Sequence, residues 1–200
     1  MPRITKEDKA RNRQGIVEAA SRLFRLRGVD AVGIADLMKD AGLTHGGFYN
    51  HFPSKEALAV EVFNAAFADS LDRLAATVRR GPDGSQSPLE RVVDRYLSAP
   101  HRDAGDGGCP SASLVTDAWR QSGHVQAAYT KGVEGYVTGF AEEITREAAQ
   151  QGVNVDSAEA RARAIRLLSE LVGAMVLARA VHRVQPALSD EILHSARQAR

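Results

Sequence analysis

Side chains suited to nucleic acids are concentrated in residues 44–55. His45 can reach a purine N7 or O6 or a phosphate, and three further side chains suit phosphates: Tyr49, His51 and Lys55. Gly46 and Gly47 each weaken a helix by about 1 kcal/mol relative to alanine. Two such residues in succession on a surface helix favour a backbone that lies close to another surface, as it would against DNA.

These residues also have ordinary explanations. Tyr49 taken alone is typical of an aromatic at the edge of a core. His45 and His51 suggest a metal pair, but two histidines on one helix more often bind a metal when they are four residues apart. These two are six apart and have no cysteine or carboxylate partner nearby. We therefore expect no metal and no cofactor, and we favour DNA for the string as a whole.

Two short helices and a turn would position these side chains. The periodicity predicts helices over residues 34–41 and 45–52, joined by a four-residue turn. Gly42 takes the positive φ that the turn needs, Leu43 fills the wedge between the helices, and the hydroxyl of Thr44 caps the second helix. This is a helix-turn-helix, whose second helix enters a major groove by its N-terminal end.

The flanking helices complete the unit. The first begins with a capping box after Thr5 and ends at Gly28. Ser54 caps a long third helix, whose first amides favour an anion. Phe48 and Phe52, four residues apart, are expected to pack the unit against the first helix.

The string from Ala41 to Leu58, AGLTHGGFYNHFPSKEAL, resembles the signature of the TetR family of bacterial transcriptional repressors. The likeness extends from about Thr5 to Leu58. It implies a homodimer that binds a palindromic operator in double-stranded DNA and is released by a small-molecule inducer. The resemblance also implies contacts with DNA by seven residues: Thr44, His45, Gly46, Tyr49, Asn50, His51 and Lys55. We add Gly47 to this predicted DNA-binding set. One departure is Gly33, which stands where the family commonly has a serine or threonine cap and offers no side chain to a phosphate.

The charge distribution agrees with a polyanionic partner for the N-terminal part. Residues 1–55 hold ten Lys/Arg and six Asp/Glu, a balance of +4, whereas residues 56–200 hold sixteen and nineteen, a balance of −3. The basic residues of the first helix are otherwise typical of a solvated face, although one or two of them are candidates for phosphate contacts: Arg3, Lys6, Lys9, Arg11 and Arg13.

The composition narrows the fold and the compartment. Of the 200 residues, 44% are apolar, which suffices for a core, but no run reaches the roughly 20 residues of a membrane span. We expect no secretory signal, and the single cysteine suits a reducing bacterial cytoplasm. The helical periodicity throughout predicts an all-α fold, with a helix-turn-helix domain over residues 1–53 and a ligand-binding and dimerisation domain over residues 54–200.

The second domain has candidates for a ligand pocket, which is expected from the family resemblance. They are mostly aromatic residues, which favour an apolar or aromatic inducer but are also typical of plain core: Phe63, Phe67, Tyr96, Trp119, Tyr129, Tyr136 and Phe140. Cys109 joins them because it precedes Pro110 at a predicted helix N-terminus, which can stabilise a thiolate. Cys109 is either a sensor of oxidants or electrophiles, or a small buried residue that suits the bend.

The last two predicted helices, 156–183 and 187–200, favour dimerisation. The former is apolar on two sides in its second half and therefore needs two packing partners. One side can face the protein's own core and the other a second subunit, in a four-helix bundle. A thick monomeric core is the alternative.

Two other classes of function compete with a ligand-responsive repressor. The sequence has no G-x-S-x-G, P-loop or H-E-x-x-H motif, so we expect no enzyme, although thiol-dependent chemistry at Cys109 is a lesser alternative. A DNA-binding protein that responds to no ligand is the other.

Overall fold

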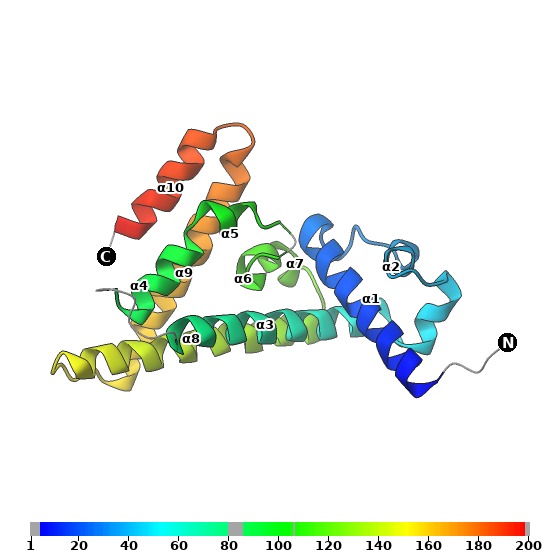
Figure 1. The fold of residues 1–200 in the computed structure, drawn as a ribbon, viewed down its shortest axis with the longest axis horizontal. Coiled ribbons are helices and arrows are strands. Elements are labelled where there is room, and N and C mark those ends of the chain that lie inside the picture. Colours follow the sequence, from blue (N-terminus) through cyan, green and yellow to red (C-terminus); the bar gives the residue numbers. More distant parts are fainter. Residues whose placement is uncertain (1–4, 80–85, 106, 199–200) are drawn as a thin grey trace. The chain divides into compact units, whose positions relative to one another are not determined.

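The computed structural model describes residues 5–79, 86–105 and 107–198, and all regular elements in these ranges are helices (Figure 1). This confirms the all-α prediction. In chain order the elements are α1 (Lys6–Arg27), α2 (Ile34–Asp40), the 3-10 helix η1 (His45–Asn50), α3 (Lys55–Arg79), α4 (Pro88–Tyr96), α5 (Ala99–Asp103), α6 (Pro110–Ser113), α7 (Val115–Ala118), α8 (Gly123–Gln150), α9 (Ser157–His182) and α10 (Pro186–Gln198).

The helix ends follow the capping residues of the sequence. The Thr5 hydroxyl accepts a hydrogen bond from the Asp8 N–H at 3.1 Å, and Gly28 ends α1 with φ 85°. Ser54 Oγ accepts from the Ala57 N–H at 3.0 Å at the start of α3. Pro100 lies in the first turn of α5, which begins at Ala99, a position where a proline is tolerated.

The chain forms two compact units, each made of two stretches. Residues 1–67 and 105–130 form the first, and residues 68–104 and 131–200 form the second. The N-terminal helices therefore share a unit with the segment that contains Cys109. This division differs from the predicted domains 1–53 and 54–200, whose boundary stays a prediction.

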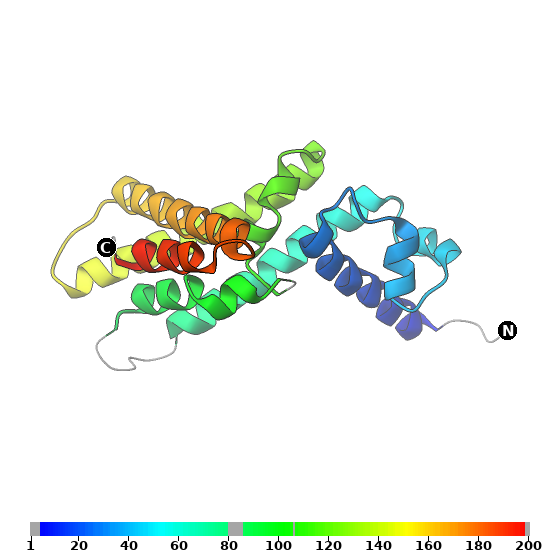
Figure 2. The ribbon, with the colours of Figure 1, turned by 90° about the horizontal axis from the view of Figure 1, so that it is seen from above.

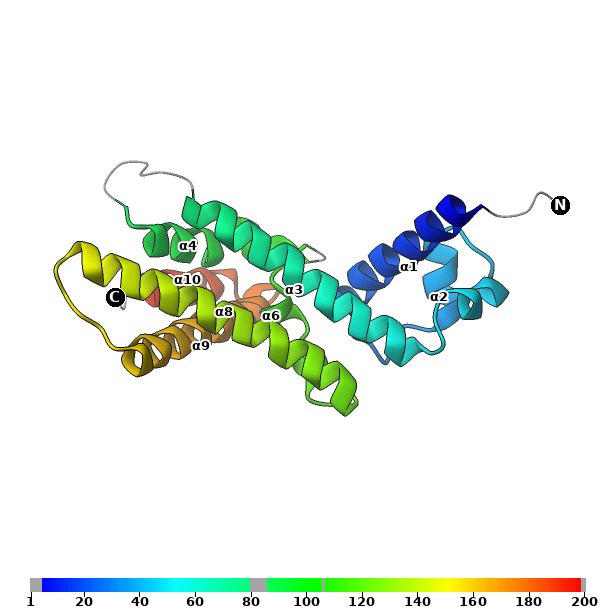
Figure 3. The same ribbon diagram turned by 90° about the horizontal axis from the view of Figure 1, so that it is seen from below.

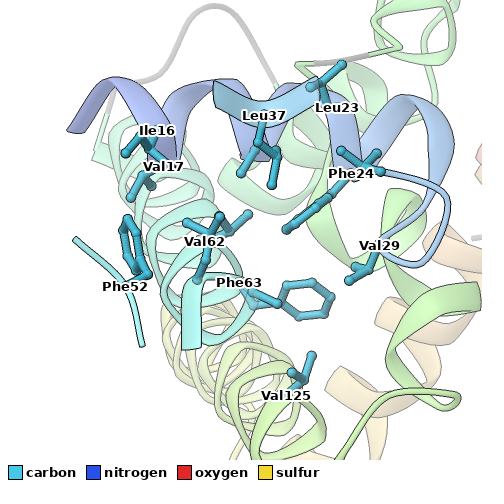
Figure 4. Close-up of a cluster of buried hydrophobic side chains, with 14 of the residues drawn as sticks. Ile16, Val17, Leu23, Phe24, Val29, Leu37, Phe52, Val62, Phe63 and Val125 are labelled. Atoms are coloured by element: carbon cyan, nitrogen blue, oxygen red, sulfur yellow. The ribbon is translucent and has the colours of Figure 1, made fainter. Parts of the chain in front are cut away.

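The first unit is built around one hydrophobic core. Apolar side chains of α1, α2 and α3, and of the residues between η1 and α3, meet there. They include Ile16, Phe24, Leu37, Phe52 and Phe63, none more than 1% exposed (Figure 4). The segment from α6 to α8 adds Leu114, Ala118 and Val125. Truncating a fully buried phenylalanine to alanine typically costs about 3–5 kcal/mol, so this core is what holds the helix-turn-helix.

The second unit contains the antiparallel pair α9 and α10, which lie side by side (Figures 1 and 2). The parts of α3 and α8 that belong to this unit cross closely (Figure 3). A Cβ on Gly135 of α8 would lie only 2.7 Å from Leu71 Cδ1 of α3, so only a glycine fits there without a shift of the leucine. Buried Arg102 joins α5 to α10 by donating to Ser189 Oγ at 3.1 Å and Asp190 Oδ1 at 2.5 Å.

Candidate nucleic-acid interface

The turn between α2 and η1 has the predicted geometry. Gly42 adopts φ 70°, a conformation that a side chain would strain, and the Leu43 N–H donates to the Met38 carbonyl at 2.8 Å. Leu43 packs partly buried against the core. An ion pair between Arg22 and Asp40 fastens the end of α2 to α1.

The second helix of the motif differs from the prediction in type and length. We expected a helix over residues 45–52, whereas the structure has a six-residue 3-10 helix, η1. Thr44 occupies the N-cap position, but its hydroxyl makes no capping hydrogen bond, so that part of the prediction is wrong. Gly46 and Gly47 have low α-helix propensity, which agrees with a short 3-10 helix at this position instead of a longer α-helix.

Two buried phenylalanines hold η1 and the residues after it against the protein. Phe48 and Phe52 are 0% and 1% exposed, and their ring centroids lie 5.8 Å apart. The Arg13 guanidinium lies 4.4 Å from the Phe52 ring centroid and forms an ion pair with Glu61 of α3. The predicted packing of both rings is confirmed, and α1 also reaches this junction through a cation–π contact.

The predicted DNA-contact residues lie together around η1 and the start of α3. Five of them are exposed: Thr44, His45, Gly46, Tyr49 and Asn50. Gly47, His51 and Lys55 are half-buried. The Tyr49 ring is 63% exposed and contacts the buried Phe48 ring edge-on, with centroids 5.3 Å apart, so it lies at the edge of the core with most of its surface open to solvent. Lys55 Nζ lies 3.4 Å from the Asp30 carbonyl oxygen, which keeps the ammonium group near the α1–α2 turn.

Among the residues that the structure describes, no packing contact requires a glycine at position 46. A Cβ on Gly46 would meet no atom within 4 Å, and one on Gly47 would make only ordinary contacts with Met38 and Thr44, at 3.5 and 3.7 Å. Neither glycine has a positive φ. The protein's own packing therefore leaves room for a side chain at Gly46, as expected if a different molecule occupies that space.

His51 lies in a positively charged environment. Its Nδ1 is buried without a hydrogen-bond partner among the described residues. Burial, together with the nearby charges of Lys9 and Arg13, holds the pKa of His51 below its usual value. The imidazole therefore becomes cationic only with difficulty unless an anion lies beside it.

Glu61 and Asp117 hold this region in place, and neither was predicted. Glu61 pairs with Arg13, 48 residues earlier, and Asp117 Oδ1 accepts a hydrogen bond from the Val29 N–H at 2.9 Å, 88 residues earlier. Periodicity carries no information about such distant partners. The one available signal was Gly28, because a helix-ending glycine can also mark a close approach.

The predicted pocket residues fall into two groups. In the first unit the Tyr129 ring contacts Phe67 edge-on, with centroids 5.3 Å apart, and Phe63 at 6.4 Å. In the second, the Tyr136 hydroxyl lies 2.5 Å from Ser70 Oγ. The remaining members of this second group are half-buried Tyr96 and buried Phe140.

Trp119 does not belong to either group. Its side chain is 69% exposed, with the Arg120 guanidinium 5.3 Å from the ring centroid. The described residues therefore do not enclose this ring, and its assignment to the pocket stays a prediction.

Cys109 is 5% exposed and occupies the N-cap position of α6. Its neighbours are polar: the Tyr129 hydroxyl donates to the Ser111 carbonyl at 2.8 Å, and Ser111 Oγ is buried with no hydrogen-bond partner among described residues. Burial, assisted by Cys109, raises the pKa of Tyr129 well above its usual value. The phenol therefore stays protonated as a hydrogen-bond donor.

In the described ranges, no helix is long and apolar enough to cross a membrane. The same part of the chain contains no group of three or more His, Cys, Asp or Glu residues able to hold a metal ion.

Comparisons with known proteins place this geometry in a family. Residues 16–62 match the family model described as bacterial regulatory proteins, tetR family. The transcriptional repressor KstR2 of Mycolicibacterium smegmatis is 30% identical over 95 residues, which are 48% of this chain and 44% of that protein. The repressor NemR of Escherichia coli is 24% identical over 125 residues, 62% of this chain and 63% of that one. The alignments thus span less than two thirds of these relatives.

Solved structures extend the likeness in fold to almost the whole chain. The reduced form of E. coli NemR has a TM-score of 0.74 at 22% identity, with 94% of this chain and 93% of that one covered. A TetR-family regulator from Cytophaga hutchinsonii has a TM-score of 0.75 at 21% identity, with 98% and 96% covered. The comparisons therefore show a match to the tetR family model over residues 16–62, and the fold of solved TetR-family regulators over almost the whole chain.

Proposed function

We propose that the protein is a sequence-specific transcriptional repressor that binds double-stranded DNA through η1. The observation that supports this most directly is the exposed side of η1, where the polar residues predicted to contact DNA surround a glycine that the protein's own packing does not require. A backbone free of side-chain bulk can approach base edges in a major groove closely.

The residues around η1 divide into two roles. His45, at the first position of η1, is assigned to base edges, together with Thr44, Gly46 and Gly47 at the approach to the groove. Tyr49, Asn50, His51 and Lys55 are assigned to the phosphate backbone of the DNA. Lys55 lies in the first turn of α3, and its charge adds to the attraction of that helix end for phosphate.

Selection of duplexes from a random library by the full chain tests the proposal. We expect a palindromic sequence to be enriched. His45→Ala should change which base pairs are preferred, whereas Lys55→Ala should weaken binding to every duplex and reduce the salt dependence. Lys131→Ala, which removes an exposed lysine far along the sequence, is the matched control. Recovery of no preferred sequence would refute the proposal.

We further propose that the repressor acts as a homodimer joined through α9 and α10. An open, mainly apolar groove runs between these helices, with Leu177 58% exposed and Leu188 37% exposed. Large apolar side chains on adjacent helices are typical of a surface that a second subunit covers. A twofold pair of η1 elements spaced by about 34–36 Å would match successive turns of a palindromic operator.

A small apolar or aromatic molecule is proposed as the inducer. The aromatic group of Phe63, Phe67 and Tyr129 supports this, because it combines apolar walls with one hydroxyl. Both phenylalanines lie on α3, the helix that also carries Lys55, so a ligand that moves α3 would also move a DNA contact. Fluorescence-detected release of the selected duplex by a panel of hydrophobic compounds tests this. No release by any compound would favour the ligand-independent alternative.

Thiol modification at Cys109 is a second proposed route to release. The α6 N-cap position and the polar neighbours of the thiol favour it, whereas its burial limits access. Alkylation of the native protein should release DNA, and Cys109→Ser should abolish that response while leaving DNA affinity unchanged. An unaltered response in Cys109→Ser would exclude this route.

A further inference from the structure

Residues 115–124, from α7 to the first turn of α8, contact both the α1–α2 turn and the first turn of α3. Asp117 Oδ1 accepts from the Val29 N–H at 2.9 Å, and Gln121 Nε2 donates to Asp30 Oδ1 at 2.9 Å. Two successive residues of the α1–α2 turn are thereby held by one short segment. Val29 itself is 2% exposed, so water cannot readily replace Asp117 at its N–H.

The same segment also holds the first turn of α3. Ser122 Oγ donates to Glu56 Oε1, and His124 Nδ1 lies 3.2 Å from the same oxygen. These contacts lower the pKa of Glu56. Beside these polar contacts, Leu114 and Val125 are 0% exposed within the core of the first unit. The segment is therefore anchored on both sides of its polar contacts.

The approach of Asp117 to the chain is unusually close. A Cβ on Gly28 would lie 2.9 Å from Asp117 Oδ1, a distance that real Cβ atoms essentially never show. Gly28 thus serves two purposes, the positive φ that ends α1 and the space for this carboxylate.

η1 depends on its neighbours for its position. It has six residues, two of them glycine, and no side-chain cap of its own. α2 precedes η1 in the chain, and Asp117 and Gln121 contact the turn before α2. α3 follows η1, and Ser122 and His124 contact its first turn. Lys55 is tied into the same network, because its ammonium group lies near the Asp30 carbonyl.

We propose that Asp117 is a positioning residue for DNA recognition, which sets the α1–α2 turn and, through it, the orientation of η1 and Lys55. The inference rests on the proposed DNA binding and names the residues that regulate its geometry. Gln121 assists by holding Asp30. Asp117 touches no DNA in this scheme; its effect passes through Val29 and α2.

The experiment measures the affinity of Asp117→Ala, in the full chain, for a duplex enriched by the wild type and for an unrelated duplex of equal length. We expect about a tenfold loss for the enriched duplex, equivalent to about 1.4 kcal/mol, and less than a twofold change for the unrelated one. Asp69→Ala is the charge-matched control, since Asp69 is exposed and pairs only within its own helix. Removing a negative charge there should leave affinity for DNA unchanged or slightly raised.

Asp117→Asn retains an acceptor oxygen and should restore most of the lost selectivity. Gln121→Ala, which leaves the Val29 hydrogen bond intact, should show a smaller loss of the same kind and replaces Asp117→Ala if thermal unfolding shows that variant to be unfolded. Equal losses on both duplexes, wild-type selectivity in the alanine variants, or no rescue by asparagine would each overturn the inference. A wild type that enriches no duplex would instead refute the proposed function itself.

Discussion

Lys9 is predicted to contact phosphate, and its replacement should change the salt dependence of DNA binding. Three arginines of α1 have acidic partners: Arg11 pairs with Asp8, Arg13 with Glu61 and Arg22 with Asp40. Lys9 is exposed and has no ion pair within the described ranges. It lies one turn before Arg13, whose guanidinium covers Phe52, so its charge is directed toward the junction of η1 and α3.

The size of the effect follows from counterion release. Each phosphate contact on duplex DNA changes the slope of log affinity against log salt by about 0.9, so a dimer that loses two contacts loses about 1.8. Raising the salt threefold should then narrow the difference between the wild type and Lys9→Ala by about sevenfold. The preferred sequence should not change, because a phosphate contact carries no base information.

Fluorescence anisotropy on the enriched duplex at four or five salt concentrations measures this slope. Arg11→Ala is the control, since it removes an equal charge from a neighbouring position. The Arg11 guanidinium is already paired with Asp8 and is therefore not expected to contact phosphate. Two results would refute this reasoning: a slope of log affinity against log salt for Lys9→Ala equal to that of the wild type, or a decrease in slope for Arg11→Ala equal to that for Lys9→Ala. Either would show that intramolecular ion pairs do not determine which basic side chains contact DNA.

Three further predictions concern η1, the dimer and pH. Gly46→Ala should leave the free energy of unfolding unchanged or raised by up to about 1 kcal/mol, because no described atom lies within 4 Å of the added methyl group. It should nevertheless weaken DNA binding tenfold or more, and unchanged binding would show that Gly46 does not face DNA. Leu177→Glu should convert the dimer to a monomer in light scattering and abolish binding to the palindrome, whereas a persisting dimer would move the interface elsewhere. Burial lowers the pKa of His101 below 6.5, so the folded state resists protonation. The neutral His101 side chain contributes fully to the stability of the fold above about pH 6.5. This contribution falls below that pH, because the unfolded chain then binds a proton at His101 more readily than the folded one. His101→Gln should therefore lose less melting temperature between pH 7.5 and 5.5 than the wild type, and exposed His194→Gln should behave as the wild type.

The sequence predicted those features that depend on neighbouring residues. The capping box at Thr5, the end of α1 at Gly28 and the positive φ of Gly42 all arise from residues within four positions of one another. The string around η1 was specific because backbone freedom, buried rings and exposed polar groups alternate within a dozen residues. These are local properties, and local reasoning found them.

The sequence could not predict contacts whose partners are distant in the chain. The N-terminal helices share a compact unit with residues 105–130, which no composition change announces. Trp119 was a candidate for the pocket because aromatic side chains supply apolar walls, but its 69% exposure depends on how the residues around α7 pack. Similarly, Thr44 was expected to cap an α-helix, whereas it precedes a 3-10 helix and its hydroxyl makes no capping hydrogen bond.

A short recognition element without a cap of its own gives the rest of the unit control over DNA binding. η1 contributes few stabilising interactions beyond the burial of Phe48, so its position is set by α2, α3 and the α7 segment. A longer, self-supporting α-helix would keep its orientation when its supports shift by small amounts. With η1, a displacement of α3 or of Asp117 passes directly to the residues assigned to DNA, because little local stability opposes it. In the proposed function, the two glycines would allow close approach to a duplex and would also make recognition sensitive to the packing of residues 105–130, as a ligand-responsive repressor requires.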